Sequence, residues 1–168
     1  MLLASDAPFE SASDVALCVL GEVRTLAHPL VRDSQRRYLL APLRAAAAHV
    51  AVFAVVAPAD NLTLVAAAYG LPHAHPAHVR TLHASHLGLS TPGQFERFPL
   101  VYEMVVAAEA ARGARFAWLI RARPDHYFYA PLPPLAPLDA RAVHTPRACG
   151  RRRTRRTRPL VGSTWTPT

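Results

Sequence analysis

The apolar positions of this chain fall into short continuous runs. Residues 15–20 (VALCVL) and 50–56 (VAVFAVV) are uninterrupted apolar segments, and each is followed by a turn residue or a proline. Such runs are typical of strands buried on both faces of a parallel sheet. The run 116–120 (FAWLI) predicts another buried strand, and residues 77–82 predict a shorter one.

Two segments between these runs have the composition and end signals of helices. Residues 34–48 predict one helix, which Pro42 should kink or divide because proline lacks a backbone N–H. Residues 61–69 predict a second, shorter helix that ends at Gly70, a residue suited to the left-handed C-terminal position.

A third helix has the clearest start and stop signals. Thr91 is expected to be its N-cap, Pro92 its first residue and Gln94 the partner in a capping box. Apolar residues then recur at helical spacing until Gly113, where the helix should end.

Alternating strands and helices predict an α/β fold with a mainly parallel, three-layer, Rossmann-like sheet. We expect this domain to cover residues 14–146, with a disordered N-terminus over 1–13 and a basic disordered tail over 147–168. The proline-rich stretch 131–137 should be a surface connection. In such sheets, ligands bind beyond the carboxyl ends of the strands.

The formal net charge of +8 belongs mostly to the tail, because six arginines fall within residues 151–158. The rest of the chain is nearly neutral. A run of this kind can bind phosphate backbones, but it has no interleaved aromatic residues for base stacking. Nucleic-acid binding through the tail is therefore only an alternative function, and nucleic acid is not the expected partner.

The sequence predicts no membrane span and no secretory leader, since the N-terminus lacks a basic segment and no apolar run approaches 18 residues. Cys18 lies within a predicted strand and should behave as a small apolar residue. A cluster of histidines could in principle bind a metal, but its spacing and prolines favour solvated loop residues. The cluster comprises His73, His75, His78, His83 and His86.

The segment Arg121-Ala122-Arg123-Pro124-Asp125 directly follows an apolar strand. Arg121 and Arg123 share one face while the strand persists, and two guanidinium groups suit a diphosphate because each can bind phosphate oxygens bidentately. Asp125 would then lie close enough to help hold Mg²⁺ or Mn²⁺. The alternative is an Arg–Asp ion pair that only pins the loop after the strand.

The stretch from Phe95 to Pro133 resembles a group of glycosyltransferase-like proteins of algae and plants. Their pattern is a helix followed by a strand that ends in W-hh-R-x-R-x-D, matched here from Trp118 to Asp125. The opening VALCVLGEVRTL also resembles their first strand and loop, with Gly21 and Arg24 in the expected places. The group is similar to GT-A nucleotide-sugar transferases.

The resemblance implies a GT-A-like domain that binds a nucleotide-diphosphate sugar and acts on a glycan or protein acceptor. Gly21 and Arg24 would line the nucleotide pocket, and Arg121 and Arg123 would hold the diphosphate. Asp125 would position the sugar or a Mn²⁺ or Mg²⁺ ion. In GT-A enzymes the comparable strand ends in D-x-D, whose two carboxylates hold a divalent metal. Here Arg123 replaces the first aspartate and only Asp125 remains, so the resemblance implies a weaker metal site.

GT-A domains have a further half after this strand that binds the acceptor. Only about thirty proline- and arginine-rich residues follow here. We therefore expect either a truncated or inactive glycosyltransferase or a non-catalytic binding module of the same fold. The resemblance would also imply a place in the Golgi or secretory pathway.

Overall fold

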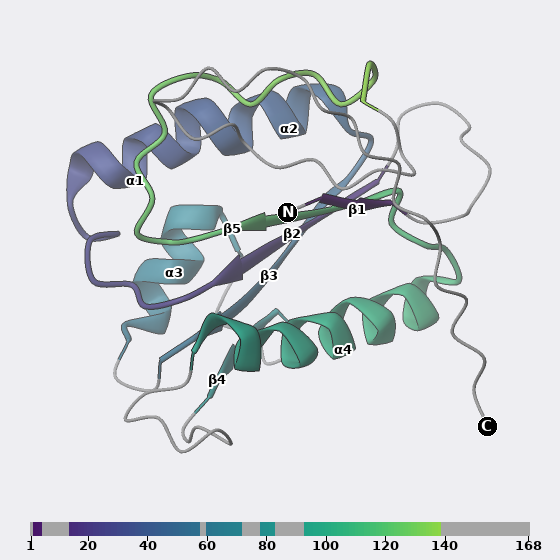
Figure 1. The fold of residues 1–168 in the computed structure, drawn as a ribbon, viewed down its shortest axis with the longest axis horizontal. Coiled ribbons are helices and arrows are strands. Elements are labelled where there is room, and N and C mark those ends of the chain that lie inside the picture. Colours follow the sequence, from purple (N-terminus) through teal and green to yellow (C-terminus); the bar gives the residue numbers. More distant parts are fainter. Residues whose placement is uncertain (1, 5–13, 58–59, 72–77, 83–92, 139–168) are drawn as a thin grey trace, which may run out of the picture.

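The computed structural model describes residues 2–4, 14–57, 60–71, 78–82 and 93–138 of the 168-residue chain. Its centre is a five-stranded sheet with the order β1-β5-β2-β3-β4 (Figure 1). β2, β3, β4 and β5 are mutually parallel, and β1 pairs antiparallel with β5. The strands are β1 (Leu2–Ala4), β2 (Val15–Leu20), β3 (Val50–Val56), β4 (Val79–Thr81) and β5 (Trp118–Ala122). The predicted α/β class is confirmed.

Two strands differ from the sequence-based prediction. β1 lies within the stretch 1–13, which was expected to be disordered, so that expectation is wrong for residues 2–4. Three residues carry no readable periodicity, and their pairing is supplied by the exposed edge of β5. β5 itself begins at Trp118 and continues to Ala122, so Arg121 is a strand residue.

The first predicted helix changes from α-helical to π-helical geometry and back, and Pro42 lies at the start of its last segment. α1 (Pro29–Gln35), the π-helical turn η1 (Arg36–Leu40) and α2 (Ala41–Ala46) follow one another without a break. Because Pro42 has no N–H to donate, the carbonyl of Tyr38 lacks its usual helical partner. That carbonyl instead accepts a hydrogen bond of 2.7 Å from the Leu132 N–H. The proline thus creates an attachment point for the segment after β5.

The other two helices end as predicted. α3 (Leu62–Tyr69) ends at Gly70, and α4 (Gln94–Arg112) ends at Gly113, both left-handed. The predicted start of α4 is wrong, because its N-cap is Gly93, whose N–H donates a 2.6 Å hydrogen bond to Oε2 of Glu96. Thr91 and Pro92 lie outside the described residues. A second capping signal, two residues further along the chain, is the one the structure uses.

Apolar side chains cover both faces of the sheet. One core cluster joins the sheet to η1, α2 and α3, and the other joins it to α4 (Figure 1). Cys18 is buried on the α4 side, as predicted, and burial raises the pKa of its thiol to about 12. The proline-rich connection 131–137 is mostly exposed, as expected of a surface connection, and its buried Leu135 anchors it to the helical layer.

The strand order identifies where a ligand edge should lie. The sheet grows from β2 through β3 to β4 in one direction, and β5 then joins β2 on its other side. The connecting helices change face at the same step, from the α1–α3 side to the α4 side. In sheets with such a reversal, ligands bind outside the carboxyl ends of the two strands that flank it. Here those ends belong to β2 and β5.

Candidate functional site at the carboxyl ends of β2 and β5

The loops after β2 and β5 approach each other at a glycine. Gly21 is buried and adopts φ +140°, a conformation that favours glycine. A Cβ atom at this position would lie 3.3 Å from Cδ of Pro124. Gly21 was predicted to line a nucleotide pocket. Its first role in the structure is to let the two strand-end loops pack closely.

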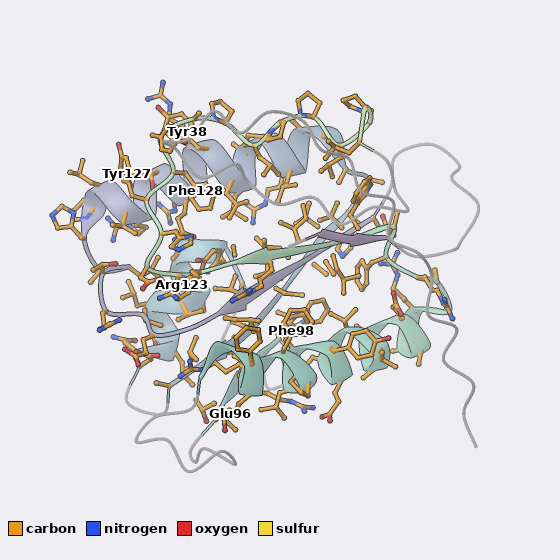
Figure 2. All side chains as sticks on the ribbon, viewed as in Figure 1. Tyr38, Glu96, Phe98, Arg123, Tyr127 and Phe128 are labelled. Atoms are coloured by element: carbon orange, nitrogen blue, oxygen red, sulfur yellow. The ribbon has the colours of Figure 1, made fainter. Side chains whose placement is uncertain are left out.

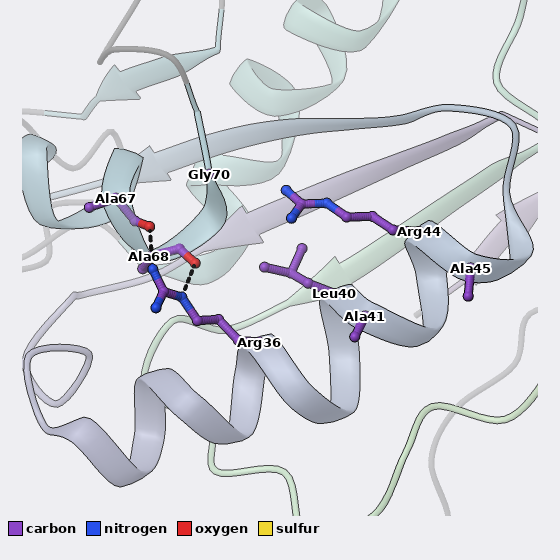
Figure 3. Close-up of a pocket in the computed structure, with 8 residues that line it drawn as sticks. All are labelled: Arg36, Leu40, Ala41, Arg44, Ala45, Ala67, Ala68 and Gly70. Carbon is purple, nitrogen blue, oxygen red and sulfur yellow. Dashed lines mark hydrogen bonds between the residues drawn. The ribbon is translucent and has the colours of Figure 1, made fainter.

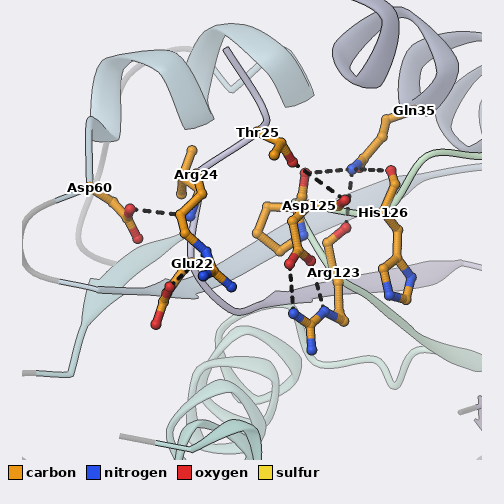
Figure 4. A network of polar contacts seen from close by, with 10 residues as sticks. Glu22, Arg24, Thr25, Gln35, Asp60, Arg123, Asp125 and His126 are labelled. Atoms are coloured by element: carbon orange, nitrogen blue, oxygen red, sulfur yellow. Dashed lines mark hydrogen bonds and ion pairs between the residues drawn. The ribbon is translucent and has the colours of Figure 1, made fainter. Parts of the chain in front are cut away.

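A buried glutamine fixes the loop after β5. Nε2 of Gln35 donates hydrogen bonds to the carbonyls of Arg123, Pro124 and His126, at 3.1, 2.8 and 3.0 Å (Figure 4). Its Oε1 accepts a 2.5 Å hydrogen bond from the hydroxyl of Tyr69. Gln35 is only 2% exposed, so these bonds form in a largely desolvated setting where they strongly restrict the loop.

Two further contacts join the neighbouring loops. The carboxylate of Asp60, after β3, accepts hydrogen bonds from the N–H groups of Ala57 at 2.7 Å and Val23 at 3.1 Å. The hydroxyl of Thr25 donates to the carbonyl of Asp125 at 3.4 Å (Figure 4). The loops after β2, β3 and β5 therefore form one connected backbone unit.

Arg123 and Asp125 form a bidentate ion pair. Nε and Nη2 of Arg123 donate to the two carboxylate oxygens of Asp125 at 2.7 and 2.6 Å. This hydrogen-bonded pairing lowers the pKa of Asp125 and raises the pKa of Arg123. The loop-pinning ion pair considered as the alternative is thus present. This ion pair directs the Nε–Nη2 edge of the Arg123 guanidinium toward Asp125.

The remaining predicted site residues have separate positions. Arg24 lies in the turn after β2, where its exposed side chain pairs with Glu22 at 2.9 Å. Arg121 is aligned with Cys18 across the β2–β5 pairing. Its neighbours Ile120 and Ala122 pack into the α1–α3 cluster, so alternation places Arg121 on the α4 face of the sheet. The predicted residues share one edge of the sheet, where Arg123 pairs with Asp125 and Arg24 pairs with Glu22.

His126 lies at the same edge and experiences the charges of both strand-end arginines. Burial lowers the pKa of its imidazole most, and the positive charges of Arg123 and Arg121 lower it further. Asp125 opposes them. The charges of Arg123 and Arg121 thus add to the effect of burial on the pKa of His126.

A divalent cation does not fit Asp125 well. Both of its carboxylate oxygens already accept hydrogen bonds from Arg123. Within the described ranges, no group of three histidine, cysteine, aspartate or glutamate side chains is placed to hold a metal ion. His78 contacts the carbonyl of Val52 through Nδ1 and stacks on Phe53. The other four histidines of the predicted cluster lie outside the described residues.

A separate groove of about 570 Å³ lies between η1–α2 and the end of α3 (Figure 3). Arg36 donates to the carbonyls of Ala67 and Ala68, and Arg44 donates to the carbonyl of Tyr69. These are the final carbonyls of α3, which have no partner within the helix. Both arginines therefore cap that helix, and their positive charge suits its C-terminal end.

The sequence analysis did not single out Gln35, Tyr69, Asp60 or His126. A signal for Gln35 existed, since it precedes the buried Leu39 and Leu43 by four and eight residues and so interrupts an apolar stripe. The basic run at 151–158 lies outside the described residues. In the described part of the chain, no helix is long and apolar enough to cross a membrane.

Comparisons with protein-family models, with curated proteins and with solved structures found no match to this chain.

Proposed function

We propose that this chain is a glycosyltransferase-like protein that binds a nucleotide-diphosphate sugar at the carboxyl ends of β2 and β5. The observation that carries the proposal is the reversal of strand order between β2 and β5. Arginines lie at both of these strand ends, Arg24 after β2 and Arg121 and Arg123 at the end of β5. Arg121 and Arg123 are proposed to take up the diphosphate charge. Gly21 and Arg24 would border the nucleotide, and Asp125 would orient the sugar.

The rigid backbone at this edge supports a binding role. Gln35, Asp60 and Thr25 hold the three adjacent loops through side-chain hydrogen bonds. A preorganised site loses less conformational entropy when its ligand binds. Arg123 and Arg121 also bring positive charge to this edge, which favours an anionic ligand.

A non-catalytic binding module is the second candidate, and the acidic side chains favour it. Asp125 is bonded to Arg123, Glu22 to Arg24, and the carboxylate of Asp60 to two backbone N–H groups. A general base needs a carboxylate within reach of the proton that it removes. At this edge, these three carboxylates are committed to structural partners.

Calorimetric titration with UDP-glucose and UDP-galactose, with and without Mn²⁺, tests the proposal. We expect binding that does not need Mn²⁺ and that weakens in Arg123→Gln and Asp125→Asn. Arg37→Gln, an exposed arginine on η1, is the matched control. Absence of binding, or equal binding in all variants, would overturn the proposal. Sugar transfer or nucleotide-sugar hydrolysis by the protein would eliminate the non-catalytic alternative.

A further inference from the structure

Arg97 is a buried cation in the first turns of α4. Its side chain is only 3% exposed, although α4 is a surface helix with many exposed positions. Val101 and Met104 follow it by four and seven residues and pack against the sheet, so Arg97 lies on the same buried stripe of the helix. Figure 2 shows the neighbouring Phe98 on the side of α4 that faces the sheet and Glu96 on the opposite side.

The buried edge of this guanidinium has no hydrogen-bond partner among the described residues. Nε and Nη2 of Arg97 are inaccessible to solvent and have no hydrogen-bond acceptor in the part of the chain that the structure describes. Arg123 uses the same two nitrogens to bind both oxygens of Asp125. This edge matches the spacing of two oxygens on a carboxylate or phosphate. Buried charged donors are rarely left unpaired, because their desolvation is then uncompensated.

The position of Arg97 favours an anion. α4 is 19 residues long, and its N-terminal end carries partial positive charge and backbone N–H groups that point outward. The carboxylate of Glu96 lies in the same turn and accepts a hydrogen bond from the Gly93 N–H at 2.6 Å. α4 packs on β2 and β3 after the connection from the carboxyl end of β4, so its N-terminus lies at the carboxyl edge of the sheet. Arg121 projects on this same face of the sheet, from the strand on the other side of β2.

We propose that Arg97 binds a phosphoryl group, with its Nε and Nη2 donating to two oxygens at the N-terminal end of α4. The helix terminus and a second arginine on the same sheet face favour a diphosphate, which carries one negative charge on each of its two phosphoryl groups, over a single carboxylate. This inference rests on the proposed function for the source of that group, a nucleotide-diphosphate sugar. Arg97 would be a phosphate-binding residue on α4, in addition to those proposed at the end of β5 and in the loop after β2.

The test measures thermal unfolding with inorganic phosphate, pyrophosphate, UDP and UDP-glucose as separate probes. We expect pyrophosphate and the nucleotides to raise the melting temperature of the wild type. Arg97→Met should lose this rise while its ligand-free stability is kept or increased, because an uncompensated buried charge is replaced by an apolar chain of similar length. Arg115→Met, an exposed arginine just after α4, is the control and should keep the rise.

Arg97→Lys distinguishes bidentate hydrogen bonding by the guanidinium from the effect of its positive charge. Lysine keeps the positive charge but cannot bind two oxygens side by side, so affinity for pyrophosphate should fall by roughly tenfold or more. A destabilised, ligand-responsive Arg97→Met variant would overturn the proposal, and so would a wild type that responds to none of the probes. Pyrophosphate binding that depends on Arg97, without any preference for UDP-glucose, would support this site and contradict the nucleotide-sugar proposal. UDP-glucose binding that depends on Arg123 but not on Arg97 would support the nucleotide-sugar proposal and contradict the Arg97 site.

Discussion

Gly21 and Pro124 lie close together where the loops after β2 and β5 meet. A Cβ atom on Gly21 would lie 3.3 Å from the ring of Pro124, and the φ of +140° at Gly21 is itself unfavourable for other residues. The contact sets the spacing of the two loops that carry Arg24 and Arg123. A change at Gly21 should therefore affect both stability and the geometry of the proposed site.

We predict that Gly21→Ala lowers the free energy of unfolding by about 2–3 kcal/mol, from backbone strain and the displaced proline together. Gly113→Ala is the matched control, since Gly113 also has positive φ, +68°, but open space around its Cα. That substitution should cost about 1 kcal/mol. Urea denaturation of both variants provides the measurement. Equal losses would show that the Pro124 contact contributes nothing.

Gln35 is predicted to contribute more to stability than its partner hydroxyl. Gln35→Met preserves volume but removes the donor shared by three carbonyls, and it should lower the free energy of unfolding by about 2–4 kcal/mol. Tyr69→Phe removes one hydrogen bond and should cost about 1 kcal/mol. Amide hydrogen exchange should accelerate in residues 123–128 of the Gln35 variant. A larger loss in Tyr69→Phe than in Gln35→Met would contradict this account.

The parts of the fold that the sequence predicted are those set by local signals. Continuous apolar runs identified β2 and β3, and the glycines after α3 and α4 identified the ends of those helices. The start of α4 was misplaced because Thr91-Pro92 and Gly93 both offer capping chemistry, and local sequence does not rank them. β1 was missed since its pairing depends on β5, more than a hundred residues away.

The candidate site was only partly predictable for a related reason. The end of β5 was recognisable because charged residues directly follow an apolar run. The pairing of the charged side chains depends on loop geometry, which the sequence does not give. In the structure the guanidinium of Arg123 binds the carboxylate of Asp125. Gln35 and Arg97 both interrupt apolar stripes at helical spacing. Polar residues at such positions are the signal by which their roles could have been anticipated.

The Arg123–Asp125 pair predicts a specific acid dependence. Because the pKa of Asp125 is lowered in the folded state, the pair stabilises the fold fully above the ordinary aspartate pKa. This contribution should be lost as the pH falls below about 4, toward the lower folded value. Asp125→Asn should therefore be less stable than the wild type at pH 7, and the two should converge in acid. Urea midpoints between pH 7 and pH 2 measure this.

A matched control for the acid dependence is Glu103→Gln. The Glu103 carboxylate is 64% exposed and lies 3.8 Å from Arg80, so this substitution removes a charge from a weakly held surface pair. Its stability should track that of the wild type across the same pH range. If Asp125→Asn also runs parallel to the wild type at every pH, the ion pair does not stabilise the fold.

His126 should report on the proposed ligand. The positive charges of Arg123 and Arg121 contribute to its lowered pKa, so a bound diphosphate that neutralises them should raise that pKa. We expect NMR titration of the histidine ring signals to show this rise on addition of UDP. His126→Gln identifies the signal. As a control, the ring signals of His49, just before β3 at the opposite edge of the sheet, should not shift when UDP is added.

Substitution of Arg123 provides the internal check on this electrostatic interpretation. Arg123→Gln removes one positive charge and releases the negative charge of Asp125, and both changes should raise the pKa of His126 without any ligand. Added UDP should then move that pKa less than it does in the wild type, because one of the charges it would neutralise is gone. A His126 titration that UDP leaves unchanged in the wild type would mean that no anion binds beside these arginines. The strand-end loop would then serve only to fasten β5 to the helical layer.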